Sequence, residues 1–376
     1  MSTIRISASE SEPSGYDVII EADALQTLPS VLARVAPAHR YALLTDSNVA
    51  RHWGDAVLGS LSSAGLQAEQ IVFEAGERNK TRDTWSLLTD RMLELGFGRD
   101  SCVIALGGGV VGDLAGFVAA TYMRGVPVVQ VPTTLLAMID ASVGGKTGVD
   151  SPAGKNLVGA FYPPRVVLAD PRTLRTLPSV ELVGGLAEAI KHGAIADGAY
   201  FDWIEENADA LLAGEEVLLG ALVHGSVFIK AGFVAEDVHE HGARAVLNFG
   251  HTIAHALERV TDYGLHHGHA VAIGMVLEAR TAELQGIAEK GTAGRLTRLC
   301  QCVGLPTMLP AGVAAADVLR AGTSDKKARA GQTRYALISR IGEVARGEAG
   351  EWTWQLPAEL IRQALTEDQS AYTTTS

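Results

Sequence analysis

Carboxylate and imidazole side chains in the second half of the sequence have the spacing of a metal site. The stretch GLAEAIKHG carries Glu188 and Lys191, which share one face if the segment is helical. By the same spacing, the stretch LNFGHTIAHALE places Asn248, His251, His255 and Glu258 on one helical face. The stretch GLHHGHAVAIGM adds His266, His267 and His269 just before another predicted helix. One carboxylate and two histidines can hold a catalytic zinc ion and leave positions open for substrate oxygen atoms. The alternative is that each histidine is an ordinary polar residue with its hydrogen bonds satisfied.

Basic side chains recur in glycine-rich or apolar stretches, where solvation alone does not account for them. They are Lys146, Lys155, Lys191, Lys230, Arg244 and Lys326. A cation in such surroundings costs free energy unless it is paired, so each one could belong to a structural ion pair. Six of them in a chain with a predicted metal and nucleotide site instead indicate an anionic substrate, with a phosphate and a carboxylate.

The stretch LGGGVVGDLAG predicts a nucleotide-binding turn. Gly107, Gly109 and Gly112 match the pattern G-x-G-x-x-G after the apolar run SCVIAL, and a helix N-terminus without Cβ atoms can receive a pyrophosphate. An acidic residue normally follows about twenty residues later, but the corresponding stretch PVVQVPTT has none. Asp46, at the end of RYALLTD, is the alternative acid for the ribose hydroxyls. The competing interpretation is a tight turn that needs glycine only for packing.

The elements that position these residues fall into two groups. Short apolar runs alternate with amphipathic stretches in the first half, which is typical of a parallel sheet covered by helices on both faces. The predicted strands are RYALLTD, AEQIVFEAGE, SCVIALGGG, PVVQVPTT and RVVLAD. After Pro178 the pattern becomes helical. We therefore expect an α/β nucleotide-binding domain over residues 1–175 and a mainly α-helical metal- and substrate-binding domain over residues 176–376, with the active site in the cleft between them.

Composition argues against several classes of protein. The formal net charge is −12, so the basic surface that a nucleic acid partner requires is not expected. The three cysteines have no zinc or disulfide spacing, which fits a reducing compartment. The segment MSTIRISASE lacks the apolar core of a signal peptide. No run of about 18 apolar residues predicts a membrane span, and we expect a cytoplasmic protein without a membrane partner.

Seven longer motifs resemble those of the 3-dehydroquinate synthase family. They are GGGVVGDLAGFVAATYMRG, VPTTLLAMIDASVGGKTGVD, GKNLVGAFYPP, GLAEAIKHG, LNFGHTIAHALE, HGHAVAIGM and DKKARAGQTRYALISRIG. The resemblance implies a homodimer of the shikimate pathway that binds NAD and a divalent metal, zinc or cobalt. It implies conversion of 3-deoxy-D-arabino-heptulosonate 7-phosphate to 3-dehydroquinate and phosphate. The implied steps are transient oxidation by NAD, β-elimination of phosphate, reduction and an intramolecular aldol reaction.

The resemblance also implies roles for particular residues. The metal ligands would be Glu188, His251 and His267. The nucleotide contacts would be Asp46, Asn48, Glu77, Lys80, Gly108, Gly109, Asp113, Thr133, Thr134, Lys155, Thr176 and Leu177. The substrate residues would be Asp140, Lys146, Asn156, Lys191, Lys230, Arg244, Asn248, His255 and Lys326. Arg124 resembles an arginine that reaches the phosphate bound by the neighbouring subunit. Two positions depart from the family pattern: His269 stands where glutamate is common, and Ala254 where glycine is common.

Other functions share part of this pattern. Another sugar phosphate cyclase, such as a 2-deoxy-scyllo-inosose, valiolone-type or aminodehydroquinate synthase, would use the same cofactors. Substrates of the first two lack a carboxylate, whereas Lys230, Arg244 and Lys326 together favour a substrate that carries one. A metal-dependent polyol dehydrogenase would release NADH at each turnover and would not need the basic residues. An inactive nucleotide-binding protein would lack the metal ligands or Lys146.

Overall fold

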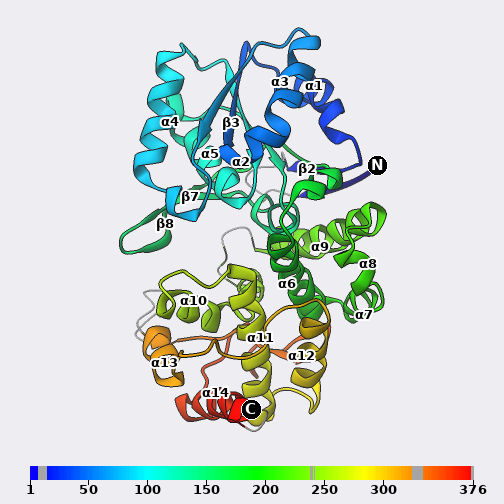
Figure 1. The fold of residues 1–376 in the computed structure, drawn as a ribbon, viewed down its shortest axis with the longest axis vertical. Coiled ribbons are helices and arrows are strands. Elements are labelled where there is room, and N and C mark those ends of the chain that lie inside the picture. Colours follow the sequence, from blue (N-terminus) through cyan, green and yellow to red (C-terminus); the bar gives the residue numbers. More distant parts are fainter. Residues whose placement is uncertain (7–14, 238–239, 241, 324–332, 374–376) are drawn as a thin grey trace. The chain divides into compact units, whose positions relative to one another are not determined.

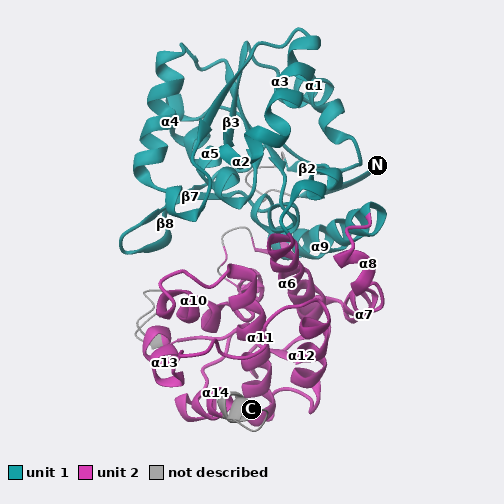
Figure 2. Ribbon diagram, in the orientation of Figure 1, with its two compact units in different colours: residues 1–178, 216–235 teal, residues 179–215, 236–376 magenta. Residues whose placement is uncertain are grey.

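The computed structural model describes residues 1–6, 15–237, 240, 242–323 and 333–373, so Lys326 lies outside the described residues. The chain divides into two compact units (Figure 2). Unit 1 comprises residues 1–178 and 216–235, and unit 2 comprises residues 179–215 and 236–376. The sequence analysis placed one boundary after residue 175. The structure differs because helix α9 (Glu216–Glu236) returns to unit 1, where its residues pair with Arg175 and Asp140.

Unit 1 is built on a seven-stranded sheet with the order β1-β2-β9-β6-β5-β3-β4. Its strands are β1 (Ser2–Ile6), β2 (Tyr16–Ile20), β3 (Arg40–Asp46), β4 (Ala68–Phe73), β5 (Ser101–Gly107), β6 (Val128–Pro132) and β9 (Val166–Ala169). The β1–β2 pair is antiparallel, and the other neighbouring strands of the sheet are parallel. Every residue of β5 is buried, as expected for a strand covered on both faces. The predicted parallel sheet is confirmed.

Helices cover both faces of this sheet (Figure 1). Helices α1 (Ala24–Val35) and α3 (Asp55–Ser63) pack on one face, and α4 (Arg82–Glu94) and α5 (Gly109–Thr121) pack on the other. The neighbouring parallel strands β3 and β5 are followed by connections that run to opposite sides of the sheet. From β3 the chain continues to β4 on one side, and from β5 it continues to β6 on the other. Ligands of such sheets bind beyond the carboxyl ends of the strands at this switch point.

Two further features complete unit 1. A hairpin is formed by β7 (Lys146–Ser151) and β8 (Gly154–Phe161). Helix α9 is, among the described residues, the one helix long and apolar enough to cross a membrane by length and composition. Half of the span that meets this test is buried, and Lys230 forms an ion pair with Asp140 inside unit 1. These features are those of a core helix.

Unit 2 is mainly helical, which confirms the predicted class of the second half. Its helices are α6 (Ser179–Ala196), α7 (Gly198–Glu206), α8 (Ala208–Leu212), α10 (His251–Val260), α11 (His267–Leu284), α12 (Thr292–Cys302), α13 (Ala315–Thr323) and α14 (Ala358–Thr373). A short hairpin is formed by β10 (Ile338–Arg340) and β11 (Glu343–Val344). Helix α11 is buried along most of its length and contacts α6, α10, α12 and α14, so it is the central helix of the unit.

Candidate functional site

Three helices of unit 2 bring the predicted metal ligands together. Glu188 lies on the buried part of α6, whereas His251 and His267 are the first residues of α10 and α11. The Nε2 atoms of His251 and His267 lie 3.3 and 3.4 Å from Glu188 Oε1. One ligand atom of each residue lies within 4.8 Å of the other two. This donor set of one carboxylate and two imidazoles fits a zinc-like divalent ion.

The other ring nitrogens of both histidines face acceptors. His267 Nδ1 lies 3.2 Å from Glu258 Oε1, and His251 Nδ1 lies 3.2 Å from the carbonyl oxygen of Phe249. An acceptor at Nδ1 fixes the orientation of a ring that binds metal through Nε2. The sequence analysis placed Glu258 on this helical face without giving it a role. The sequence signal that could have indicated this role is that Glu258 lies seven residues, about two helical turns, after His251.

Charges around the carboxylate of Glu188 keep it ionised. This side chain is fully buried, and its Oε2 pairs with Lys191. Burial opposes ionisation, but the charge of Lys191 and the hydrogen bonds of the two histidines hold the pKa of Glu188 well below its usual value. Burial also lowers the pKa of His251. For His267, hydrogen bonds and charges of Glu188 and Glu258 outweigh burial and raise the pKa to about 9, so a metal ion has to displace a proton there.

Close contacts at two glycine pairs make this arrangement possible. A Cβ atom on Gly268 would lie 2.3 Å from the carbonyl oxygen of Gly184, and one on Gly274 would lie 2.0 Å from the carbonyl oxygen of Gly250. The first contact joins α11 to α6, and the second joins α11 to the start of α10. Gly250 also has a φ of 82°, which glycine adopts without steric cost. A side chain at these positions would separate the helices that carry the ligands.

The neighbouring histidines of the HHGH stretch face a different carboxylate. His266 Nε2 lies 3.2 Å from Glu181 Oε2. The rings of His266 and His269 lie 5.4 Å apart. Of the three histidines in this stretch, the structure therefore brings His267 to Glu188.

The other predicted substrate residues of unit 2 lie near the start of α10. Arg244 is buried in a 3-10 turn, and its backbone N–H donates to Asp237 Oδ2 over 3.1 Å. Asn248 Nδ2 donates to Glu240 Oε1 over 2.8 Å. The ring of His255 lies 5.6 Å from that of the first residue of α10. His255 is therefore next to the metal ligands, although it is not one of the three.

Predicted nucleotide contacts lie beyond the carboxyl ends of β5 and β6. Gly108 precedes the first turn of α5, and the backbone N–H of Thr133 donates to the carbonyl oxygen of Gly107 over 2.9 Å. A Cβ atom on Gly108 would lie 2.9 Å from Thr134 Cγ2, so only glycine leaves this backbone open. The buried hydroxyl of Thr133 has no hydrogen-bond partner among the described residues. Such a group suits a ligand with polar atoms, and the residues present fit a nucleotide.

Other glycines of the same stretch serve packing. A Cβ atom on Gly107 would lie 2.4 Å from Val111 Cγ2, and one on Gly112 would lie 2.8 Å from Gln130 Oε1. These contacts hold α5 against the sheet. Gly107 and Gly112 therefore have the packing role of the competing interpretation, whereas the nucleotide role of Gly108 and Gly109 stays a prediction.

The alternative acid of the sequence analysis lies at the switch point of the sheet. Asp46 ends β3, which pairs directly with β5. Its Oδ1 accepts from the backbone N–H groups of Asn48 and Val49 in the short helix α2 (Ser47–Val49), over 2.8 and 2.9 Å. The Thr176 hydroxyl accepts from the indole N–H of Trp53 over 3.0 Å, and the predicted contact Leu177 directly follows this threonine.

A third group of predicted residues surrounds the buried side chain of Lys80. Its Nζ lies 2.5 Å from Asp113 Oδ2 and 2.5 Å from Asn156 Oδ1, and Lys155 Nζ lies 3.8 Å from Glu77 Oε1. Burial raises the pKa of Asp113. Burial would lower the pKa of Lys80, but the charges of Asp113 and Glu77 raise it. Four predicted nucleotide residues and one predicted substrate residue therefore belong to one polar network.

The remaining predicted residues of unit 1 have different surroundings. Asp140 lies in the π-helical turn Ala137–Ala141, and Lys230 Nζ donates to its backbone oxygen and to its Oδ1, each over 2.6 Å. Lys230 is therefore half of an ion pair, as the structural alternative predicts. Lys146 begins β7 and is exposed. Arg124 is exposed and has a left-handed φ of 71°.

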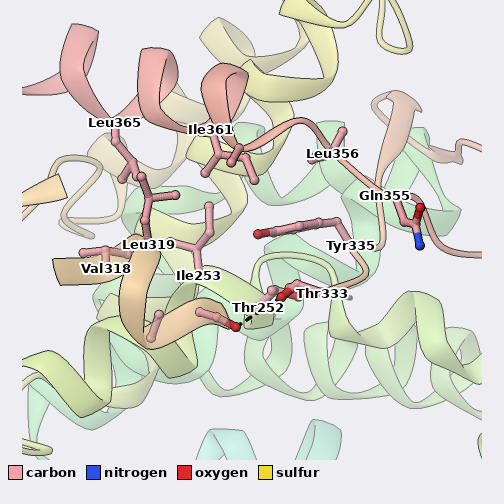
Figure 3. Close-up of a pocket in the computed structure, with 13 residues that line it drawn as sticks. Thr252, Ile253, Val318, Leu319, Thr333, Tyr335, Gln355, Leu356, Ile361 and Leu365 are labelled. Carbon is pink, nitrogen blue, oxygen red and sulfur yellow. Dashed lines mark hydrogen bonds between the residues drawn. The ribbon is translucent and has the colours of Figure 1, made fainter. Parts of the chain in front are cut away.

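A cavity of about 270 Å³ in unit 2 is lined by other residues (Figure 3). It lies between α10, α13 and α14, with Ile253, Leu319 and Leu365 among its apolar walls, and the hydroxyl-bearing side chains of Thr252 and Tyr335 also line it. None of the residues that line it is a predicted site residue. The cavity is therefore not the candidate site.

Solved structures share this fold over nearly the whole chain. One is 2-deoxy-scyllo-inosose synthase in complex with carbaglucose-6-phosphate, NAD+ and Co2+, with 25% identity, a TM-score of 0.89 and coverage of 98% of this chain and 100% of that one. Another is 2-epi-5-epi-valiolone synthase from Streptomyces hygroscopicus with NAD+ and Zn2+ bound, with 27% identity, a TM-score of 0.86 and coverage of 97% and 99%. The chain thus has the fold of the sugar phosphate cyclases.

Sequence comparison narrows this class. The family described as 3-dehydroquinate synthase N-terminal matches residues 70–184, and that described as 3-dehydroquinate synthase C-terminal matches residues 185–328. The 3-dehydroquinate synthase of Xanthomonas campestris pv. campestris is 50% identical over 320 residues, which cover 83% of this chain and 86% of that relative. The chain belongs to the 3-dehydroquinate synthase family.

Proposed function

We propose that this chain converts 3-deoxy-D-arabino-heptulosonate 7-phosphate to 3-dehydroquinate and phosphate, as a cytoplasmic enzyme of the shikimate pathway. The observation that carries the proposal is the convergence of Glu188, His251 and His267 in a chain of this family. The relative from Xanthomonas campestris, named for this product, is 50% identical. The cyclases named for other products are 25% and 27% identical.

The proposed cofactors are NAD in unit 1 and a divalent ion, zinc or cobalt, in unit 2. The two solved cyclases contain NAD+ with Co2+ or Zn2+. When bound, NAD would supply a hydride acceptor for the substrate. The metal supplies a Lewis acid for substrate oxygen atoms. Asp46, Gly108 and Thr133 would hold the nucleotide at the switch point of the sheet.

The residues around the metal site each have a defined task in this proposal. Lys191 keeps the carboxylate of Glu188 ionised and available as a ligand. Glu258 and the carbonyl oxygen of Phe249 orient the two imidazoles. Glu258 Oε1, 3.2 Å from His267 Nδ1, keeps a proton on this nitrogen, so that Nε2 is the nitrogen that would give up its proton to bind the ion.

Anion binding is the proposed task of the basic residues. Lys146, Arg244 and Lys230 would bind the phosphate and carboxylate groups of the substrate, together with Lys326. Lys230 has a second task, because its ion pair with Asp140 fixes the side chain of that carboxylate. All of these residues bind and orient one substrate, and the proposed reaction needs no protein nucleophile.

We also propose that the chain works as a homodimer. Arg124 is exposed, and its side chain makes no hydrogen bond or ion pair with the described residues, so it is available to a second copy. Strand β8 of the hairpin exposes Leu157, Val158 and Phe161, with 49%, 37% and 48% of each residue accessible. Exposed apolar side chains gathered on one strand are typical of a contact surface.

An assay of the purified protein tests the proposed function. It would contain 3-deoxy-D-arabino-heptulosonate 7-phosphate, NAD+ and zinc, and would follow phosphate, the carbocyclic product and free NADH. We expect equal amounts of phosphate and 3-dehydroquinate without accumulation of NADH. Phosphate release from glucose 6-phosphate or sedoheptulose 7-phosphate, but not from this substrate, would assign another cyclase activity. Steady accumulation of NADH would assign a dehydrogenase.

A further inference from the structure

Glu278 is a buried acidic residue without a role in the site described above. It lies in α11, and its side chain is inaccessible to solvent. Within the part of the chain that the structure describes, it has no ion-pair partner. A buried carboxyl group without a cation costs free energy unless its oxygen atoms accept hydrogen bonds. Burial accordingly raises the pKa of Glu278 to about 8. A residue this costly in the central helix indicates a specific use.

The oxygen atoms of Glu278 accept from the start of α10. Oε2 accepts from the backbone N–H of Gly250 over 2.7 Å, and Oε1 accepts from that of Ile253 over 3.2 Å. The nearby N–H of Thr252 also lowers the pKa of this carboxyl group. The first N–H groups of a helix have no partner within the helix and need an acceptor. Gly250 has no side chain that could cap α10, so a residue of another helix performs this task.

His251 lies between the residues that Glu278 holds. Gly250 precedes this ligand, and Thr252 and Ile253 follow it. The position of His251 relative to Glu188 therefore depends on how firmly the first turn of α10 is held. A shift of this turn would move His251 Nε2, which lies 3.3 Å from Glu188 Oε1. Glu188 and His267 belong to other helices, so His251 is the ligand on which this cap acts most directly.

We propose that Glu278 is a positioning residue for the metal ligand His251, through the cap that it provides to the first turn of α10. This inference rests on the proposed metal site. Residues that hold a ligand from outside the coordination sphere typically change metal affinity by about 10- to 100-fold. The structure also gives a graded test, because glutamine retains one acceptor oxygen at this position and alanine retains none.

The experiment measures zinc affinity by chelator competition and the visible spectrum of the cobalt-loaded protein. The variants are Glu278→Gln and Glu278→Ala. Thr281→Val is the matched control, since Thr281 is buried in the same helix and its hydroxyl donates only within α11, to the carbonyl oxygen of Leu277. We expect Glu278→Ala to weaken zinc binding at least tenfold and to alter the cobalt spectrum. The zinc affinity of Glu278→Gln should lie between those of Glu278→Ala and the wild type. The zinc affinity of Thr281→Val should be within twofold of the wild type.

Each outcome separates this inference from the proposed function. A wild type that binds no zinc would overturn the metal site itself. Equal zinc affinity and an unchanged cobalt spectrum in both Glu278 variants, with metal bound by the wild type, would overturn only the role of Glu278. If Glu278→Ala does not fold, the test uses Glu278→Gln instead. Its zinc affinity and the amide hydrogen exchange of residues 250–253 are then compared with those of the wild type. Faster exchange at these amides with weaker zinc binding supports the cap, and unchanged exchange overturns it.

Discussion

Gly184 of α6 and Gly268 of α11 lie in direct backbone contact. A Cβ atom on Gly268 would lie 2.4 Å from Gly184 Cα, closer than any side chain permits. Gly184 is one helical turn before Glu188, and Gly268 directly follows His267, so this contact sets the distance between two of the proposed metal ligands. The metal site therefore depends on two residues that have no chemistry of their own.

Replacing Gly268 by alanine should disrupt this site. The added methyl group must push α11 away from backbone atoms that cannot move aside, which typically costs about 1–3 kcal/mol. We expect a lower melting temperature and at least tenfold weaker zinc binding, measured by thermal unfolding and chelator competition. Gly294→Ala in α12 is the control, because only the end of the Arg298 side chain lies within 4 Å of its Cβ position. Equal melting temperatures and equal zinc affinities in Gly268→Ala and Gly294→Ala would show that the contact between Gly184 and Gly268 does not set the metal site.

Metal affinity should depend steeply on pH. Hydrogen bonds and charges of Glu188 and Glu258 outweigh burial and raise the pKa of His267 to about 9, so this imidazole is protonated at neutral pH in the metal-free protein. A ligand imidazole has to be neutral. The apparent dissociation constant for zinc should fall about tenfold for each pH unit up to pH 9. Calorimetry in buffers of different ionisation enthalpy should show about one proton released per ion at pH 7. Absence of proton release would show that another group binds the metal.

The three histidines of the HHGH stretch should differ in their effect on metal content. His267→Ala removes a predicted ligand and should leave the purified protein without bound metal, as measured by elemental analysis. His266→Ala and His269→Ala should retain it, because His266 faces Glu181 instead. Metal at the wild-type level in His267→Ala, with loss in either of the other variants, would reassign the ligand.

The hydroxyl of Thr133 should affect NAD binding but not folding. It has no hydrogen-bond partner among the described residues, so Thr133→Val should leave the melting temperature of the NAD-free protein unchanged or slightly raised. Loss of one hydrogen bond to NAD should weaken binding about 2- to 10-fold. Thr147→Val is the matched control, because its hydroxyl donates to the carbonyl oxygen of Ala160 over 3.0 Å. This control should lose stability and keep its NAD affinity. Equal NAD affinity in Thr133→Val and wild type would remove Thr133 from the nucleotide site.

Mixing two inactive variants tests whether Arg124 acts on the partner subunit. Arg124→Ala should fold normally and lose most activity, because the exposed side chain contributes only to substrate binding. Subunits of this variant, exchanged with His267→Ala subunits, should regain about a quarter of wild-type activity. Half of the dimers would then contain one subunit of each variant, and each of these mixed dimers would have one complete site of two. No recovery after demonstrated subunit exchange would place Arg124 in the site of its own chain.

The main elements of unit 1 could be predicted because local sequence determines them. The apolar run RYALLTD corresponds to β3 at both ends, and the buried parallel strands require no information beyond their own composition. The spacing of His251 and His255 likewise predicted one face of a helix. These features depend on neighbours within about two turns of the chain.

Long-range packing could not be predicted in the same way. Helix α9 is apolar on more than one side, and only its ion pair with Asp140 and its packing show that it belongs to unit 1. Glu278 appeared as one acidic residue in an apolar helix, and its role depends on how α11 lies against the first turn of α10. From sequence alone, glycine residues were interpreted as turn positions. Gly268 and Gly274 instead allow close contacts between helices. The individual site residues, including the three ligands, stay predictions until binding is measured.

The division of the chain has a consequence for its synthesis. Neither unit is a continuous segment, because residues 216–235 belong to unit 1 and follow the first part of unit 2. The amino-terminal unit is therefore incomplete when residue 178 leaves the ribosome, and Asp140 then lacks the lysine that neutralises it. A gene cut at this position would encode a first fragment that lacks residues 216–235 of unit 1, and a second fragment that carries this helix together with the whole of unit 2.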